Sequence, residues 1–170
     1  MSIERPMPPV DANERDMLEG WLDFHRSTLA LKCEGLTDSR LRVAAVPPSE
    51  MSLLGLVRHM ADVERHWYRR VLAGEDHPPL HYTDDDPDGD FHAARTDTWE
   101  RAYAVWQGEI AAARTVAAEF RLDEPSRGRH RRTGLPSTLR WIHTHMIEEY
   151  ARHNGHADLI RECLDGTTGV

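Results

Sequence analysis

Apolar residues recur every three or four positions in four long segments of this chain, and this helical spacing is the feature that most constrains its fold. No stretch alternates apolar and polar residues as a half-buried strand would. We therefore expect residues 1–170 to form a single all-α domain, an antiparallel four-helix bundle of the usual size for one domain. The predicted helices run from about Asn13 to Lys32, from about Met51 to Leu72, from Phe91 or Ala93 to Phe120, and from Pro136 or Ser137 to Asp165.

Charge and composition exclude several functions. The formal net charge is −8, which argues against a nucleic-acid partner. No apolar run approaches the ~18 residues of a membrane span, and the first ten residues lack the core of a signal peptide. Two cysteines, Cys33 and Cys163, are too few for a disulfide framework. We expect a cytoplasmic protein that binds neither membranes nor nucleic acids.

Polar side chains interrupt the apolar stripe of the fourth predicted helix. At about 100° per residue, Glu149, His153 and His156 all point within about 40° of the direction shared by Ile142 and Ile160. An inward carboxylate is costly unless it is paired or coordinated. Because Glu149 and His153 are four residues apart, their side chains lie one above the other and can share one divalent ion.

A facing helix can supply a third ligand. In the second helix His59 lies at the edge of the apolar stripe that contains Leu56 and Val63. Two histidines and one glutamate with an open position are typical of a reactive zinc site, and the same set suits nickel or iron. The sequence thus predicts a metal site made by His59, Glu149 and His153.

Other histidines and charges have less specific interpretations. His156 is either a fourth ligand or a hydrogen-bond partner that orients a ligand, and His145 is a weaker candidate for the second role. Glu149 can also pair with a histidinium or with Arg152 without any metal. The acidic loop 75–90 is expected to be solvated surface. The arginines at 127, 129, 131 and 132 are expected to be solvated or to meet an anionic ligand group. We expect six further histidines on the surface: His66, His77, His81, His92, His130 and His143.

Two motifs together resemble the DinB superfamily, in the branch called the domain-of-unknown-function 664 group. The second helix contains GLVRHMADVERHW from Gly55, and the fourth contains HMIEEYARHNGHADLIRE from His145. The resemblance implies a DinB-type four-helix bundle, often dimeric, with one metal-binding histidine from the second helix and an i, i+4 pair from the fourth. Many members carry histidine at the first position of that pair, whereas this chain has Glu149, as the mycothiol-dependent isomerase branch does. His156 stands where many members have glutamine, so the resemblance does not extend to it as a ligand.

The resemblance also implies a chemistry. Characterised relatives use the metal with a low-molecular-weight thiol, so we expect a mycothiol S-transferase-like enzyme in which a metal-bound thiolate attacks an electrophilic small molecule. The preference for arginine over lysine is typical of high-GC actinobacteria and favours mycothiol as the thiol. Zn²⁺ is the expected ion, with Ni²⁺ or Fe²⁺ as alternatives, and a homodimer is the expected assembly. No protein nucleophile is required, and we expect Cys33 and Cys163 to be core or helix-end residues. Two other functions stay open: a metal-binding bundle without turnover, and a metal-dependent hydrolase or isomerase.

Overall fold

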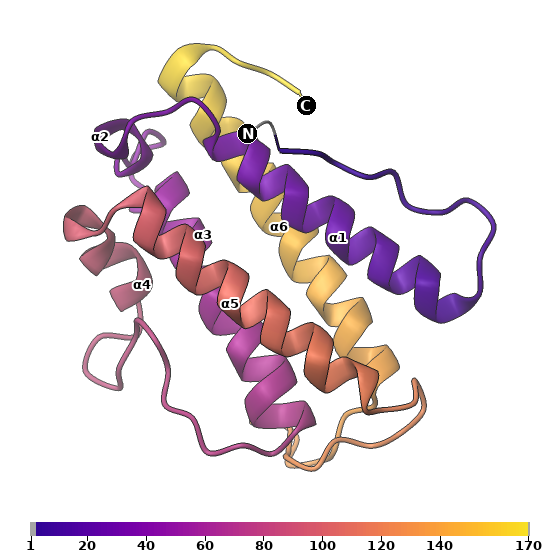
Figure 1. Cartoon of the computed structure of the whole chain (residues 1–170). Coiled ribbons are helices and arrows are strands. Elements are labelled where there is room, and N and C mark those ends of the chain that lie inside the picture. The colour runs from indigo at the N-terminus through magenta and orange to yellow at the C-terminus, as the bar shows by residue number, and fades with distance from the viewer. Residues whose placement is uncertain (1–2, 170) are drawn as a thin grey trace.

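A computed structural model, which describes residues 3–169, shows four long helical rods (Figure 1). No strand forms within these residues, which contain only an isolated bridge between Pro125 and Thr138. The prediction of an all-α four-helix bundle is confirmed. The rods are α1 (Glu14–Cys33), α3 (Leu53–Glu64) continued by the π-helix η1 (Arg65–Leu72), α5 (Trp99–Ala118) and α6 (Leu139–Asp165). The shorter elements are α2 (Asp38–Leu41), α4 (Gly89–His92) and the 3₁₀ helix η2 (Ala93–Thr96).

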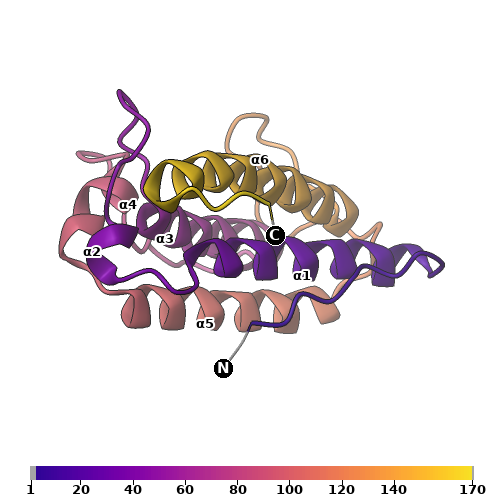
Figure 2. The same ribbon diagram turned by 90° about the horizontal axis from the view of Figure 1, so that it is seen from above.

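Two helix pairs form the bundle. α1 packs along α6, α3 packs along α5, and α3 also packs against α6. The view from above shows α6 and α3 on one side, with α1 and α5 on the other (Figure 2). Two cavities of about 580 and 560 Å³ open along the seam between α1 and α5.

Side-chain caps fix where the helices begin. In each long helix an oxygen of the preceding residue accepts a backbone N–H three residues further on, which satisfies a donor that the helix itself leaves unpaired. The capping residues are Asn13, Ser52, Thr98 and Thr138. At the other end, α6 stops at Gly166, whose φ of 77° is the left-handed conformation that glycine adopts without strain.

The third predicted helix is wrong at its N-terminal end. Residues 89–96 form α4 and η2, and the chain then becomes extended at Asp97 before α5 begins. The Asp97 carboxylate is buried in an ion pair with Arg58 of α3, and Thr98 caps the helix that follows. This tertiary ion pair breaks a stretch that local periodicity alone reads as continuous.

One polar network joins all four long rods inside the apolar core. Arg26 of α1 donates two hydrogen bonds to the Glu64 carboxylate, at 2.8 and 3.0 Å. The Tyr150 hydroxyl of α6 donates to the same carboxylate at 2.7 Å, and the Trp106 indole of α5 donates to the Tyr150 oxygen at 2.9 Å. Because its members are mutually paired, this network can specify how the helices pack without leaving a buried charge unpaired.

His143 is the clearest error in the predicted surface. Its side chain, expected to be exposed, is only 2% exposed. α6 packs against both α1 and α3, so its buried arc is wider than the single stripe that Ile142 and Ile160 define. His143 lies on the part of that arc that faces α1.

Two further features bear on the predicted class of protein. Within residues 3–169, no helix has both the length and the apolar character that a bilayer crossing needs. Cys33 is buried at the last position of α1, whereas Cys163 is exposed near the end of α6.

Candidate metal centre

The packing of α3 on α6 brings three potential ligands together. His59 comes from α3, and Glu149 and His153 come from successive turns of α6. Each offers one ligand atom, and these atoms lie within 4.8 Å of one another. The imidazole rings of His59 and His153 have centroids 4.7 Å apart, and the Glu149 carboxylate lies 3.5 Å from Nε2 of His153. We call these three residues the ligand cluster.

Glu149 is ionised at neutral pH. Burial alone would raise the pKa of this carboxyl, but hydrogen bonds from His153 and Arg152, together with the positive charge of Arg152, lower its pKa to about 2. The pairing with Arg152 is the metal-free arrangement that the sequence left open, and the structure contains it. However, the Arg152 side chain is 51% exposed, so its guanidinium can leave Glu149 and stay hydrated.

Asp90 orients His59, a role that nothing in the sequence indicates. Oδ2 of Asp90 lies 2.7 Å from Nδ1 of His59, and the Asp90 side chain is 5% exposed. A carboxylate in this position keeps the proton on Nδ1 and leaves Nε2 with its lone pair available to a metal. The prediction of a solvated acidic loop is therefore wrong for Asp90, although Asp84, Asp85 and Asp88 are exposed as expected.

A glycine allows α4 to carry Asp90 to His59. A Cβ at Gly55 would lie 2.6 Å from Cδ1 of Phe91, so only glycine permits this approach. The Phe91 ring in turn stacks on the His59 ring, with centroids 5.7 Å apart. Arg58 completes the contact by donating from Nε to the backbone oxygen of Asp90 at 3.0 Å. The loop between α3 and α5 is thus fixed to α3 beside the cluster.

The two other candidate histidines flank the cluster. Nδ1 of His156 lies 3.3 Å from Nδ1 of His153, on the side away from Glu149. His145 stacks on Trp141, with ring centroids 5.0 Å apart, and its Nε2 lies 3.4 Å from the Glu149 carboxylate. Burial lowers the pKa of both His145 and His156, which favours neutral imidazoles next to the cluster.

A cavity of about 300 Å³ adjoins the cluster at His59. Its walls include Val63, Trp67 and Tyr82, and Asp90 lines it beside His59. Arg131 is the member of the arginine group that reaches this cavity, which keeps open the expectation that an arginine meets an anionic ligand group. The π-helix η1 contributes Trp67, whose ring packs edge-on against His145, with centroids 4.6 Å apart.

The residues present fit a divalent cation. Two imidazoles and one ionised carboxylate from two helices match the donor set of zinc, nickel or ferrous sites that keep a position open for a substrate. The paired Nδ1 of His59 supplies the outer hydrogen bond that metal-binding histidines usually have. The cavity at His59 provides space on one side of the cluster.

Comparisons with known proteins agree with the fold and the motifs. The sequence model of the mycothiol-S-transferase family matches residues 17–166. A conserved protein from Enterococcus faecalis has a similar crystal structure, with a TM-score of 0.61 and 14% sequence identity over 92% of this chain and 100% of that chain. At that identity the likeness supports the fold alone. No curated protein matches the sequence. The family match extends from α1 through α6, so the chain belongs to the mycothiol-S-transferase family.

Proposed function

We propose that this protein is a divalent-metal-dependent thiol S-transferase that joins the sulfur of mycothiol to an electrophilic carbon of a small molecule. The observation that carries the proposal is the ligand cluster of His59, Glu149 and His153 next to a cavity. Membership of the mycothiol-S-transferase family supports the choice of thiol. The proposal takes Zn²⁺ as the ion and a cytoplasmic homodimer of one domain per chain as the form of the protein.

Each residue of the cluster has a defined part. His59, Glu149 and His153 would hold the ion, and Asp90 holds the Nδ1 proton of His59 so that Nε2 stays available. When bound, a divalent ion lowers the pKa of a thiol that coordinates it, which makes the sulfur a nucleophile at neutral pH. His145 and His156 are both placed to accept the released proton, because they lie 3.4 Å from the Glu149 carboxylate and 3.3 Å from Nδ1 of His153, respectively.

The cavity beside His59 would orient the second substrate, the electrophilic small molecule. Trp67 and Val63 give it an apolar wall that excludes water from the electrophile, and Arg131 can pair with an anionic substituent. Cys33 and Cys163 have no part in this chemistry. Burial raises the pKa of Cys33 to about 12, and neither cysteine belongs to the cluster.

Conjugation to monochlorobimane tests the proposal. The purified protein is loaded with Zn²⁺, Ni²⁺ or Fe²⁺ and incubated with mycothiol, bacillithiol or glutathione. We expect metal-dependent formation of the fluorescent thioether with mycothiol above the uncatalysed rate. His153→Ala and Glu149→Gln proteins should lose bound metal and conjugation together. His92→Ala is the matched control, because His92 is an exposed histidine paired with Asp86 and Glu50 outside the cluster.

Other outcomes would overturn the proposal in different ways. Full metal content in the His59→Ala and His153→Ala proteins would refute the ligand assignment. Tight metal binding without conjugation of any thiol would favour a binding protein without turnover. Metal-dependent cleavage or isomerisation of a substrate in the absence of thiol would favour the hydrolase or isomerase alternative.

A further inference from the structure

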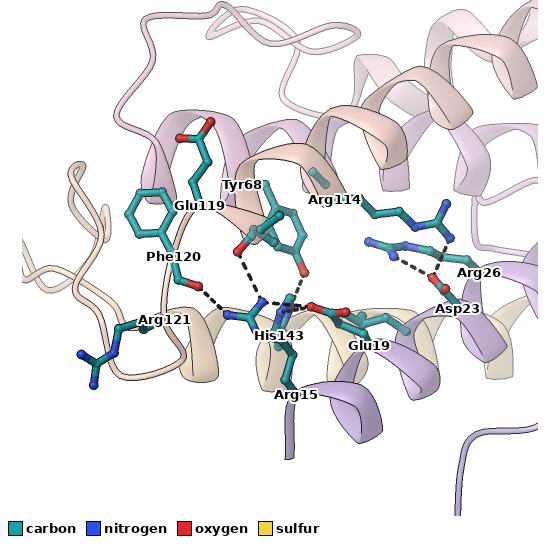
Figure 3. A pocket seen from close by; sticks show the side chains of 14 residues that line it. Arg15, Glu19, Asp23, Arg26, Tyr68, Arg114, Glu119, Phe120, Arg121 and His143 are labelled. Atoms are coloured by element: carbon teal, nitrogen blue, oxygen red, sulfur yellow. Dashed lines mark hydrogen bonds and ion pairs between the residues drawn. The ribbon is translucent and has the colours of Figure 1, made fainter. Parts of the chain in front are cut away.

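The larger of the two cavities between α1 and α5, of about 580 Å³, is the one that His143 lines (Figure 3). It shares no lining residue with the ligand cluster or with the cavity beside His59. Its floor is made by Tyr68 of η1 and His143 of α6, and its walls come from α1 and α5. The proposed S-transferase reaction makes no use of it.

His143 lines this cavity and has a buried ring nitrogen without a hydrogen-bond partner among the described residues. Its side chain is 2% exposed, and within residues 3–169 its buried Nε2 has no hydrogen-bond partner. The other ring nitrogen, Nδ1, lies 2.8 Å from the Tyr68 hydroxyl. Burial lowers the pKa of His143 to about 4 and raises that of Tyr68, so both groups are uncharged at neutral pH.

The pair with Tyr68 determines which nitrogen carries the proton. A buried phenol is most stable when it donates its proton, and among residues 3–169 the acceptor within hydrogen-bond distance of the Tyr68 hydroxyl is Nδ1 of His143. Nδ1 therefore accepts, and the ring proton of His143 is on Nε2. A buried N–H donor without an acceptor is unfavourable by about 1–3 kcal/mol, so Nε2 favours a ligand atom that accepts.

Glu19 selects the kind of acceptor. Its carboxylate lies 3.9 Å from Nε2 of His143, too far for a direct hydrogen bond (Figure 3). Two hydrogen bonds of about 2.8 Å can meet at one oxygen placed between these atoms, with an angle near 90°. A hydroxyl suits that position, because it accepts from Nε2–H and donates to the carboxylate. A ligand carboxylate or carbonyl has no proton to donate, so its oxygen and the Glu19 oxygen would be two acceptors that repel each other.

The arginines around the cavity do not favour an anion, because their charges are already paired. Arg15 binds Glu19 at 3.1 Å and also the backbone oxygens of Ala117 and Phe120. Arg26 is held by Glu64, and Arg114 binds Asp23 at 2.8 Å. The fourth arginine of the lining, Arg121, has the Asp123 carboxylate 3.5 Å away. The apolar part of the lining includes Leu22, Ala113 and Phe120.

We propose that the 580 Å³ cavity between α1 and α5 binds a small uncharged alcohol, whose hydroxyl bridges Nε2 of His143 and the Glu19 carboxylate. The apolar body of the ligand lies against Leu22, Ala113 and Phe120. The site is separate from the ligand cluster and does not depend on the proposed transferase activity.

Methyl NMR on the full-length, metal-loaded protein tests this site. Ala113, Ala117 and Ala118 all line the cavity, so ¹³C-methyl alanine labels report on its occupant directly. Three probes share one ring and differ in charge: cyclohexanol, cyclohexanecarboxylate and cyclohexylammonium. We expect saturable shifts of these three methyl signals with cyclohexanol and at least about tenfold weaker binding of the two charged probes, which corresponds to one lost hydrogen bond. Long-range ¹H–¹⁵N spectra should show the proton of His143 on Nε2.

Two pairs of variants separate binding from general effects. Ala118→Trp narrows the cavity from an exposed helix position and should weaken cyclohexanol binding about tenfold or more, whereas Ala111→Trp, on the same helix outside the lining, should not. Glu19→Ala should weaken binding about tenfold, and Glu119→Ala, which removes an equal charge from the same rim, should leave it within about twofold.

Three results would overturn the proposal. These are no saturable binding of cyclohexanol, equal or tighter binding of cyclohexanecarboxylate, and equal effects of the Glu19→Ala and Glu119→Ala substitutions. Metal content and bimane conjugation should be unchanged in the Ala118→Trp protein, so failure at this cavity and failure of the transferase proposal are distinguishable.

Discussion

Replacing Asp90 by asparagine tests how the centre is organised. The substitution keeps the size of the side chain and removes the charge of the acceptor that lies 2.7 Å from Nδ1 of His59. The amide oxygen of the introduced asparagine can still accept from Nδ1 or from the backbone N–H of Phe91, which Asp90 accepts at 3.0 Å. The fold of α4 should therefore persist while His59 loses a charged partner.

The size of the effect follows from the burial of this pair. A hydrogen bond to a charged group contributes about 1.5–3 kcal/mol, and the upper half of that range applies because the Asp90 side chain is only 5% exposed. Since about 1.4 kcal/mol corresponds to a factor of ten, we expect metal affinity to fall by about 40- to 140-fold.

Competition against a chromophoric chelator measures that change for Zn²⁺ and Ni²⁺. Asp86→Asn is a closely matched control: the Asp86 carboxylate also lies 2.7 Å from a histidine Nδ1, that of His92, but the pair is exposed and outside the cluster. Metal affinity within about twofold of wild type in Asp90→Asn, or an equal loss in both variants, would refute the orienting role of Asp90.

Three further predictions concern the scaffold. Glu64→Gln should lower the free energy of unfolding by about 3–5 kcal/mol, because it leaves the buried Arg26 with Asp23 as its remaining charged partner and leaves the bidentate pair with Glu64 uncompensated. Urea denaturation with exposed Glu162→Gln as control measures this change, and a loss below about 1 kcal/mol contradicts the prediction. Gly55→Ala should destabilise the protein by about 1–3 kcal/mol, because the added methyl group meets Phe91. Metal binding should also weaken, because Phe91 adjoins Asp90, the partner of His59. Unchanged thermal unfolding and unchanged metal affinity would argue against this packing. Burial lowers the pKa of His143 from 6.5 in the unfolded chain to about 4 in the folded protein. Between these two pH values the unfolded state therefore binds more protons than the folded state. The free energy of unfolding should rise with pH across this window, by up to about 3 kcal/mol. His143→Gln should flatten that rise in urea titrations from pH 4 to 7, and an unaltered slope would show that His143 does not cause it.

The candidate centre is predictable from sequence only in part. The i, i+4 spacing of Glu149 and His153 is local helix geometry, so the sequence alone places these two side chains together. The position of His59 at the edge of its own stripe suggests a third ligand, but its distance from α6 depends on how two helices separated by about 90 residues pack. The sequence predicts solvated surface at Asp90, because nothing in an acidic loop indicates that its last carboxylate is buried against a histidine 31 residues away.

Errors in burial have the same physical origin. The sequence shows one stripe per helix, whereas α6 touches both α1 and α3 and buries residues on two sides. A single stripe leaves His143 on the surface, although it lies under α1 beside Tyr68. The buried partners Arg26 and Glu64 lie on helices that meet only in the folded bundle, so no spacing within either helix reveals their ion pair.

Backbone periodicity and the chemistry of the caps are local properties, and for this reason the order of amino acids is enough to define the four rods, most of their ends and the pair of ligands on α6. Long-range packing sets the rest. It brings α3 to α6, carries Asp90 to His59 through the close contact at Gly55, and leaves the α1–α5 seam open above His143. These features depend on the distance between surfaces that are far apart in the chain, and only the folded bundle sets that distance.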